Sequence, residues 1–111
     1  MSPEATRDLF PGALEMMILR TLKRQPLHGY ALAQHIKRTS DELLQIEEGS
    51  LYPALQRMLI KGWVTAEWGV TAGNRRARYY RLTAGGRKQL AAELSQFQRV
   101  FGAIARVVQI A

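Results

Sequence analysis

Residues 62–83 read GWVTAEWGVTAGNRRARYYRLT. Residues 63–68 and 78–82 are rich in aromatic and β-branched side chains, as β-strands are. Residues 69–77, between them, include two glycines and an asparagine and are too long for a tight turn. We therefore predict a two-stranded hairpin with a long, basic tip. Because an isolated hairpin is only marginally stable, it must pack against the rest of the chain.

Three helices are predicted before this hairpin, over about residues 12–24, 29–38 and 48–61. In each of them apolar residues recur three or four positions apart, which places these residues on one face of a helix. The first helix ends before Pro26, because the residue that precedes a proline is pushed out of the helical region. Gly62 suits the end of the third helix. Pro53 places the start of its regular part near Ser50, because proline is best tolerated in the first turn.

A final helix is predicted from Thr83, which suits an N-cap, to about Val108. Gly85-Gly86 in its first turns weakens helix propensity and indicates close backbone packing there. Further along, apolar residues alternate in steps of four and three and form a heptad-like seam: Leu90, Leu94, Phe97, Phe101, Ile104 and Val108. The seam could pack on its own domain, but it is longer than a small three-helix core needs. We therefore predict that it forms the interface of a homodimer.

The order of these elements predicts the fold class. Three helices, a hairpin and a long terminal helix make a mainly α fold with a small β-hairpin wing, a winged helix-turn-helix followed by a C-terminal dimerisation helix. We expect one compact domain, in which residues 1–82 form the DNA-binding region and residues 83–111 the dimerisation helix. One helix of such a fold can enter the major groove while basic loops hold the DNA backbone.

The composition is typical of a globular chain of one domain. The chain has 111 residues, of which 47% are hydrophobic, enough to build a core. It has no cysteine, which excludes disulfides, thiolate metal sites and thiol catalysis. No apolar run reaches the roughly 20 residues of a membrane-spanning helix, and residues 1–24 lack the pattern of a signal peptide. We therefore expect a cytoplasmic protein with no membrane partner.

The positive charge of the chain is unevenly distributed. Sixteen Lys and Arg against nine Asp and Glu give a net charge of +7. Residues 1–56 hold six basic and seven acidic side chains, whereas residues 57–111 hold ten basic and two acidic ones. A domain with such localised positive charge attracts polyanions such as nucleic acid or an anionic membrane surface, although the charge alone would also serve solubility.

The predicted hairpin tip carries the strongest functional signal, Asn74-Arg75-Arg76-Ala77-Arg78. Three arginines within four positions repel one another and contribute little to folding, whereas a phosphate backbone would neutralise them and release counterions. Arginine can also bridge phosphates or enter a narrow minor groove. We predict that Asn74, Arg75, Arg76 and Arg78 contact DNA. The alternative is a solvated loop with incidental charge.

The helices supply further candidates for DNA contact. The third helix carries four of them: Ser50, Tyr52, Gln56 and Arg57. Their hydroxyl, amide and guanidinium groups suit phosphates or base edges. Tyr52 could equally be a packed core residue with its hydroxyl at the rim. Tyr30 and Lys37 on the second helix are candidates of the same kind.

Nothing in the sequence indicates catalysis, a metal or a cofactor. His28 and His35 are seven residues apart but have no third ligand nearby in the sequence. Glu47-Glu48, at a helix start, suits the helix dipole rather than acid–base chemistry. Neither a phosphate-binding glycine motif nor a nucleophile elbow occurs in the sequence. We therefore predict that the chain is not an enzyme and needs no cofactor.

Five motifs follow one another along the chain: Leu27-His28-Gly29-Tyr30, Glu48-Gly49-Ser50-Leu51-Tyr52-Pro53-Ala54-Leu55, Lys61-Gly62-Trp63, Arg75-Arg76-Ala77-Arg78-Tyr79-Tyr80-Arg81-Leu82-Thr83, and Gly86. This series resembles the PadR family of transcriptional regulators. The resemblance covers about residues 9–108. The short terminal helix is similar to that of the small subfamily, whose members have one dimerisation helix instead of a large C-terminal domain.

The resemblance implies a homodimer that binds a palindromic operator in double-stranded DNA and usually represses transcription. It implies that the recognition helix spans about residues 48–61 and the basic wing residues 69–78. By this resemblance, the side chains that face the DNA from the recognition helix are Ser50, Tyr52, Pro53 and Gln56. The wing would add Arg75, Arg76 and Arg78.

The resemblance also implies an alternative function. Some small members bind flat, hydrophobic cations between their terminal helices, stacked on an aromatic residue, which is often tryptophan. In the matching stretch this chain has Phe97. The alternative is therefore a multidrug-type sensor in which Phe97 and Phe101 contact a small hydrophobic effector. A winged helix that contacts only protein or RNA is a third hypothesis, although a long basic wing is not needed for protein partners.

Overall fold

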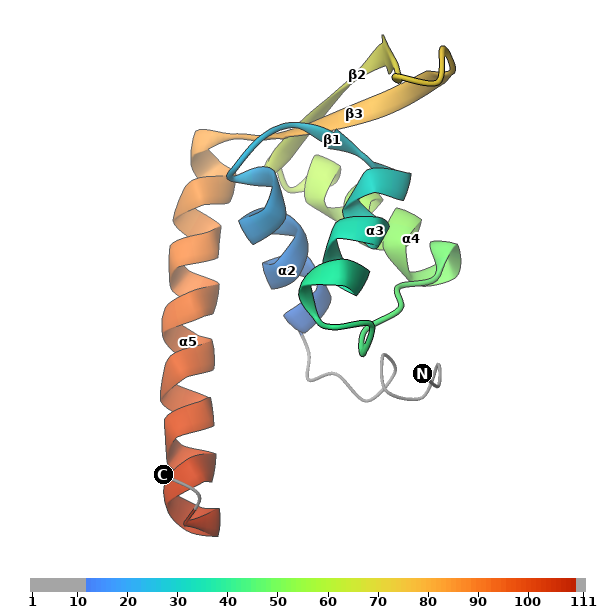
Figure 1. The fold of residues 1–111 in the computed structure, drawn as a ribbon. Helices are drawn as coiled ribbons and strands as arrows, with labels where there is room; N and C mark the ends of the chain where they lie inside the picture. Colours follow the sequence, from blue (N-terminus) through green and yellow to red (C-terminus); the bar gives the residue numbers. More distant parts are fainter. Residues whose placement is uncertain (1–11, 110–111) are drawn as a thin grey trace.

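The computed structural model of the protein describes residues 12–109; residues 1–11 and 110–111, which belong to the two predicted regions, lie outside the described part. The described elements are, in order, α2 (Ala13–Leu22), β1 (Leu27–His28), α3 (Gly29–Thr39), α4 (Glu48–Ile60), β2 (Val64–Val70), β3 (Arg76–Leu82) and α5 (Ala84–Val108). Helices α2, α3 and α4 pack together beneath the sheet, and α5 runs along one side (Figure 1). The predicted mainly α, winged helix-turn-helix fold is confirmed.

The sheet has three antiparallel strands in the order β1-β3-β2, one more than predicted. β1 is only two residues long and pairs Leu27 with Tyr80 and His28 with Tyr79. It follows Pro26 and is too short to show a strand pattern of its own. Pairing with β3 therefore makes it a strand, rather than local propensity.

The two hairpin strands extend further toward the tip than the sequence pattern predicts. They pair until Val70 lies opposite Arg76, so residues 71–75 alone form the turn. Gly69 is a residue typical of loops, but here it gives space to the ring of Tyr79, since a Cβ at Gly69 would lie 2.9 Å from that ring. Close packing, not chain flexibility, explains this glycine.

The turn at the tip of the hairpin is held by hydrogen bonds around Thr71. The Thr71 N–H donates to the Arg75 carbonyl over 2.8 Å, and the Thr71 carbonyl accepts from the Asn74 N–H over 2.9 Å. The Thr71 hydroxyl accepts from the Arg75 N–H over 3.2 Å. Asn74 has a φ of 62°, a left-handed conformation that asparagine adopts more readily than most residues. The wing therefore ends in a defined turn rather than a long loop.

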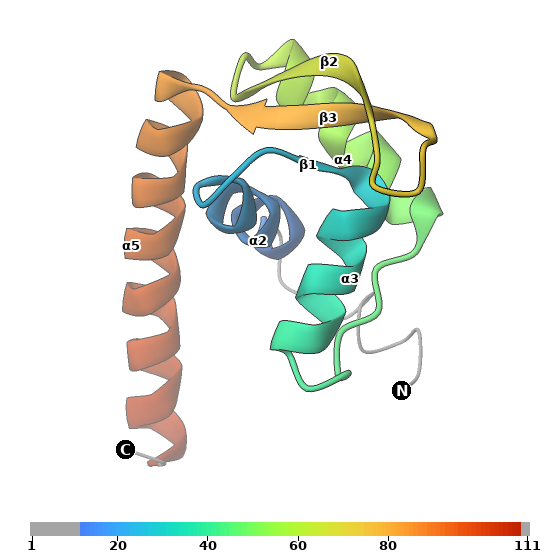
Figure 2. The ribbon, with the colours of Figure 1, turned by 45° about the horizontal axis from the view of Figure 1, so that its top comes forward.

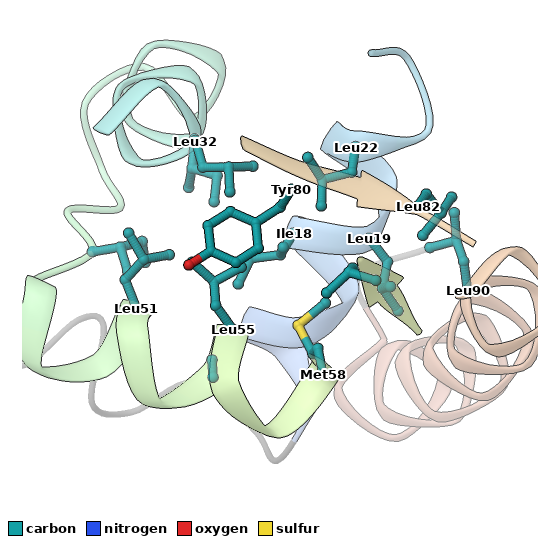
Figure 3. Packing of buried hydrophobic residues seen from close by; sticks show 14 residues of the cluster. Ile18, Leu19, Leu22, Leu32, Leu51, Leu55, Met58, Tyr80, Leu82 and Leu90 are labelled. Atoms are coloured by element: carbon teal, nitrogen blue, oxygen red, sulfur yellow. The ribbon is translucent and has the colours of Figure 1, made fainter. Parts of the chain in front are cut away.

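One hydrophobic core lies between the sheet and the helices (Figure 3). The ring of Tyr80, from the central strand, lies among side chains of α2, α3 and α4 and is 5% exposed. Leu82 and Leu90 extend this core to the start of α5. The largest fully buried side chains are Ile18, Leu19, Leu32, Leu51, Leu55, Met58 and Val64. Burying each of the aliphatic ones contributes about 1.5–3 kcal/mol, so this core fixes how the helices and the hairpin sit together.

Helix α4 begins at Glu48, as predicted, and includes Pro53; its regular part starts two residues before Ser50, where the sequence placed it. A proline has no N–H, and its ring crowds the carbonyl four residues earlier. Here that carbonyl belongs to Gly49, an exposed residue, so water can reach the carbonyl that Pro53 leaves without an N–H donor. The Ser50 N–H donates to the Glu47 carbonyl over 3.0 Å and closes the first turn. The helix therefore accommodates Pro53 as its sixth residue, in the second turn rather than in the predicted first turn.

Gly62 ends α4, as the sequence predicts. Its φ of 76° lies in the left-handed region. The Gly62 N–H donates to the Leu59 carbonyl over 3.1 Å, and the Trp63 N–H donates to the Met58 carbonyl over 3.0 Å. These two bonds satisfy carbonyls that a helix end would otherwise leave without partners, and they turn the chain into β2.

Thr83 joins the hairpin to α5. Its hydroxyl donates to the Gly62 carbonyl over 2.7 Å and accepts from the Gly86 N–H over 3.0 Å, which makes it the predicted N-cap of α5. The Thr83 N–H donates to the Trp63 carbonyl over 3.1 Å. A Cβ on Gly86 would collide with that same carbonyl oxygen, so the predicted close backbone packing is confirmed at Gly86. A Cβ on Gly85 would meet only ordinary contacts.

Helix α5 packs with its first half on the rest of the chain, and its second half extends beyond the other helices (Figures 1 and 2). Leu90 is 2% exposed and belongs to the chain's own core, and Leu94 packs against that core. The first part of the predicted seam is therefore used within the chain. This corrects the assignment of Leu90 to an interface between copies, because its side chain is already covered. No helix in residues 12–109 is both long and apolar enough to cross a lipid bilayer.

We predict that Gly86→Ala lowers the free energy of unfolding by about 1–3 kcal/mol, because its methyl group would collide with the Trp63 carbonyl and force the backbone apart. Urea unfolding at a fixed protein concentration measures this change. Gly85→Ala, one residue earlier in the same turn, is the matched control. We expect it to stay within about 1 kcal/mol of the native chain, because a Cβ fits there and alanine favours helix. Equal losses in both variants would contradict this account of the junction.

Candidate nucleic-acid interface

The outward face of α4 carries uncharged side chains. Leu51, Ala54, Leu55 and Met58 turn inward and are buried. The helical period places Pro53, Gln56 and Ile60 on the opposite face, and all three are exposed, Ile60 by 76%. A glutamine amide can pair with adenine, and apolar groups can contact the thymine methyl group, so this face has the chemistry to read bases in a major groove.

The first turns of α3 and α4 meet at Tyr52. A Cβ on Gly29 would lie 2.7 Å from the Tyr52 hydroxyl, so only a glycine allows this approach. Burial, and then the charge of Glu48 and the nearby Tyr80, raise the pKa of the Tyr52 phenol above its ordinary value. The phenol therefore stays protonated and able to donate a hydrogen bond. Tyr52 is packed on α3, and at 45% exposure its side chain also remains accessible to solvent.

Arg57 points away from the outward face of α4. Its Nη2 lies 3.2 Å from Oε2 of Glu15 on α2, and the two side chains are 53% and 22% exposed. An ion pair this accessible contributes about 0–1 kcal/mol. The sequence did not indicate this contact, because the two residues are far apart along the chain. Part of the charge of Arg57 is therefore balanced within the chain, on the side of α4 that faces α2.

The hairpin has one face that changes character along its length. Val64 opposite Leu82 is buried at its base, and Ala66 opposite Tyr80 covers the core. Toward the tip the same face presents Trp68 opposite Arg78 and then Val70 opposite Arg76. Trp68, Val70 and Arg76 are exposed, and Arg78 is exposed too. The inner face of the wing is therefore apolar at its base and cationic and aromatic at its tip.

Two of the wing arginines lie against aromatic rings. The Arg76 guanidinium lies 4.7 Å from the centre of the Trp68 ring, and the Arg78 guanidinium 6.0 Å from that of Tyr80. Such cation–π contacts hold a guanidinium in place and contribute about 0.5–1 kcal/mol at exposed sites. β3 includes Arg78, as predicted, and also Arg76, which the sequence pattern placed in the connection between the strands.

The opposite face of the hairpin is built differently. Arg81 lies 3.8 Å from Glu67, so its charge has a counterpart within the chain. The Tyr79 ring packs edge-on against His28, with their centres 5.3 Å apart. The His28 Nδ1 in turn accepts from the Ala31 N–H over 3.3 Å and caps α3. His28 therefore has a structural role at the helix start.

A groove separates the inner face of the wing from the first turns of α3 and α4. It has a volume of about 450 Å³. Beside it, a second hollow of about 650 Å³ lies beneath the wing turn, which reaches over the start of α3 (Figure 2). Of the predicted DNA contacts, five line these two hollows: Tyr30, Tyr52, Arg75, Arg76 and Arg78. The structure brings these five together from three elements and the turn.

The remaining predicted contacts lie outside the groove. Ser50, Pro53 and Gln56 are exposed on α4, and Asn74 is exposed in the wing turn. Lys37 is half-buried on α3. The sequence pattern did not indicate Trp68 and Ile60 as surface residues, since a strand tryptophan and a helix isoleucine usually lie in the core. Their exposures of 62% and 76% distinguish them.

Comparisons with known proteins agree with this arrangement. A model of the transcriptional regulator PadR-like family matches residues 18–92. The chain is 31% identical over 102 residues to the transcriptional regulator Rv3488 of Mycobacterium tuberculosis, which covers 92% of this chain and 88% of that protein.

Solved structures give the same result for the fold. A transcriptional regulator from Clostridium thermocellum is similar with a TM-score of 0.81 at 27% identity, over 89% of this chain and 96% of that one. A PadR family transcriptional regulator from Eggerthella lenta is similar with a TM-score of 0.74 at 28% identity, over 90% and 85% of the two chains. These similarities extend across the helix-turn-helix, the wing and α5.

Proposed function

The chain belongs to the PadR-like family of transcriptional regulators and is not an enzyme, and we propose that it is a homodimeric repressor that binds a palindromic operator. In this proposal residues 1–82 bind DNA and residues 83–111 join the two copies. In this proposal the protein acts in the cytoplasm. Its partners are double-stranded DNA and a second copy of the chain, with no cofactor.

The observation that carries the DNA-binding part is the position of the wing next to α4. The uncharged outward face of α4, with Pro53 and Gln56, suits base edges in the major groove. The basic side chains of the wing suit the phosphate backbone beside it, because phosphate contacts fix position while base contacts select sequence. Tyr30, Lys37, Ser50 and Tyr52 extend the backbone contacts from the helices.

The dimer is supported by the second half of α5. Phe101, Ile104 and Val108 are each more than half exposed, and Phe97 packs on Phe101 with ring centres 5.8 Å apart. Val107, on the neighbouring side of the helix, is 81% exposed. An apolar stripe of this length on a projecting helix is costly in water, and a copy of the same helix would cover it around a two-fold axis.

We predict that the protein binds the duplex upstream of its own gene far more tightly than a mixed-sequence duplex, with a steep dependence on salt. Replacing Arg75, Arg76 and Arg78 together by Ala should lower the affinity and flatten the salt dependence by about three in log–log slope, because three phosphate contacts are lost. Fluorescence anisotropy over a salt series measures both quantities.

The control variant also loses three positive charges, but on α5 instead of the wing. Arg87, Lys88 and Arg99 are exposed on α5, and their triple Ala variant should keep a slope close to that of the native chain. Equal slopes in the two variants would remove the wing from the interface. Failure of the native chain to bind any duplex at low salt would favour a protein or RNA partner instead.

We predict that Ile104→Glu converts the dimer into a monomer, because the carboxylate would be buried against the partner helix without a counter-charge. Ser95→Glu introduces the same side chain at an exposed position on another face of α5 and should leave the dimer intact. Light scattering gives the mass of each variant. A native chain that is monomeric at micromolar concentration, or a dimer that survives Ile104→Glu, would exclude this interface.

A second function is favoured by the stacked pair of Phe97 and Phe101. In a dimer these rings would lie beside the equivalent pair and could sandwich a flat, hydrophobic cation, which would release the protein from DNA. Calorimetric titration with a planar aromatic cation tests this proposal. We expect binding that Phe97→Ala and Phe101→Ala weaken. Absence of heat and of any change in DNA affinity would leave a regulator without such an effector.

A further inference from the structure

The groove between the wing and the helix starts has walls of different chemistry. One wall is the inner face of the wing, with Trp68, Arg76 and Arg78. The other is formed by Tyr30 and Tyr52 at the first turns of α3 and α4. Tyr80 closes the groove at its base, where the hairpin enters the core. The groove therefore combines cations, aromatic rings and hydroxyl groups around one open space of about 450 Å³.

We propose that this groove seats a backbone phosphate of duplex DNA, and that Trp68 is the positioning residue that holds the Arg76 guanidinium toward it. This inference rests on the proposed function and adds the site at which the wing holds the DNA strand. Trp68, an exposed residue that belongs neither to the core nor to the outward face of α4, would thereby have a role.

The position of Trp68 follows from the strand register. Trp68 lies opposite Arg78, and Val70 lies opposite Arg76, so Trp68 and Arg76 are diagonal neighbours on one face of the hairpin. The indole is 62% exposed, yet the Arg76 guanidinium lies over it at 4.7 Å. Without the ring, the long arginine side chain would sample many rotamers, and each phosphate contact would have to order it first.

The ring leaves the donors of the arginine available. A ring face attracts the charge of the guanidinium but accepts none of its in-plane N–H groups strongly, so its five donors remain for a phosphate. Within residues 12–109, neither Arg76 nor Arg78 forms an ion pair with a carboxylate. Arg78 lies 6.0 Å from the buried ring of Tyr80, so it too starts from a defined position.

The tyrosines on the opposite wall separate this groove from an acidic hollow. That hollow, between α3 and α4, is lined by Glu47 and Glu48 and by no lysine or arginine of the described residues. Tyr30 and Tyr52 line both spaces. Two carboxylates would repel a phosphate inside that hollow, whereas the two arginines attract it in the groove beside the wing. The charge distribution therefore selects the wing-side groove.

A double-mutant cycle between Trp68 and Arg76 tests the proposal, with a short mixed-sequence duplex as the probe, because phosphate contacts do not depend on sequence. Arg76→Ala should lower the affinity about five- to tenfold at about 0.1 M salt and reduce the salt slope by about one. Trp68→Leu should lower it about two- to fivefold when Arg76 is present and have no further effect in Arg76→Ala. Trp68→Phe should retain most of the affinity, because it keeps an aromatic face.

Arg81→Ala is the matched control, since Arg81 lies on the other face of β3 and faces Glu67. It should change the affinity less than about twofold, because its charge already has a counterpart. Thermal unfolding of each variant shows that the fold is kept, as expected for a residue as exposed as Trp68. Equal losses from Trp68→Leu with and without Arg76, or equal effects of Arg76→Ala and Arg81→Ala, would overturn the proposal.

The outcomes also separate this proposal from the proposed function. Coupling between Trp68 and Arg76 on mixed-sequence DNA, without preference for the upstream duplex, would keep the phosphate seat and reject the operator. Tight, specific binding of the upstream duplex without this coupling would reject only the phosphate seat. No binding to either duplex would overturn both.

Discussion

The hydrogen bonds around Thr83 hold together the three parts of the molecule that need a fixed geometry. The Thr83 hydroxyl and N–H bind the carbonyls of Gly62 and Trp63, where α4 ends and β2 begins, and the same hydroxyl caps α5 at Gly86. Because Gly86 has no side chain, the backbone of α5 lies directly against this junction. Direct hydrogen bonds and backbone packing at this junction therefore fix how α4, the wing and α5 sit relative to one another. In a dimer, the direction of α5 would then set the position of each α4 on the DNA.

One face of the hairpin serves both the core and the proposed contact with DNA. Its base supplies Val64, Tyr80 and Leu82 to the core, and its tip presents arginines above the groove. The strand that carries Arg76 is anchored further along by the buried Tyr80. The exposed pair of Trp68 and Arg76 is therefore held in place by the buried base of the hairpin. A basic wing on a free loop would lose more conformational entropy for each phosphate that it binds. The short turn between the two strands is closed by hydrogen bonds, which also limits the conformational freedom of the wing.

The sequence predicted the helices, the wing and the caps at Gly62 and Thr83, because local rules govern these features. It could not predict β1, which depends on pairing with β3, or the ion pair of Arg57 with Glu15, which depends on the packing of α4 on α2. The heptad-like spacing of α5 did not separate Leu90, buried within the chain, from the exposed residues beyond it, since both follow the same period. For Trp68, composition indicated a strand, and only the register placed it beneath Arg76.

We propose that two copies of α4, held by paired α5 helices, read two halves of one operator. Hydroxyl-radical footprinting of the DNA upstream of the protein's own gene tests it most directly. We expect two protected half-sites in inverted orientation, with centres about one helical turn apart or a multiple of it, since the symmetry of the DNA site mirrors that of the dimer. A single protected segment without an inverted partner would contradict it, because one copy of the chain would then bind alone.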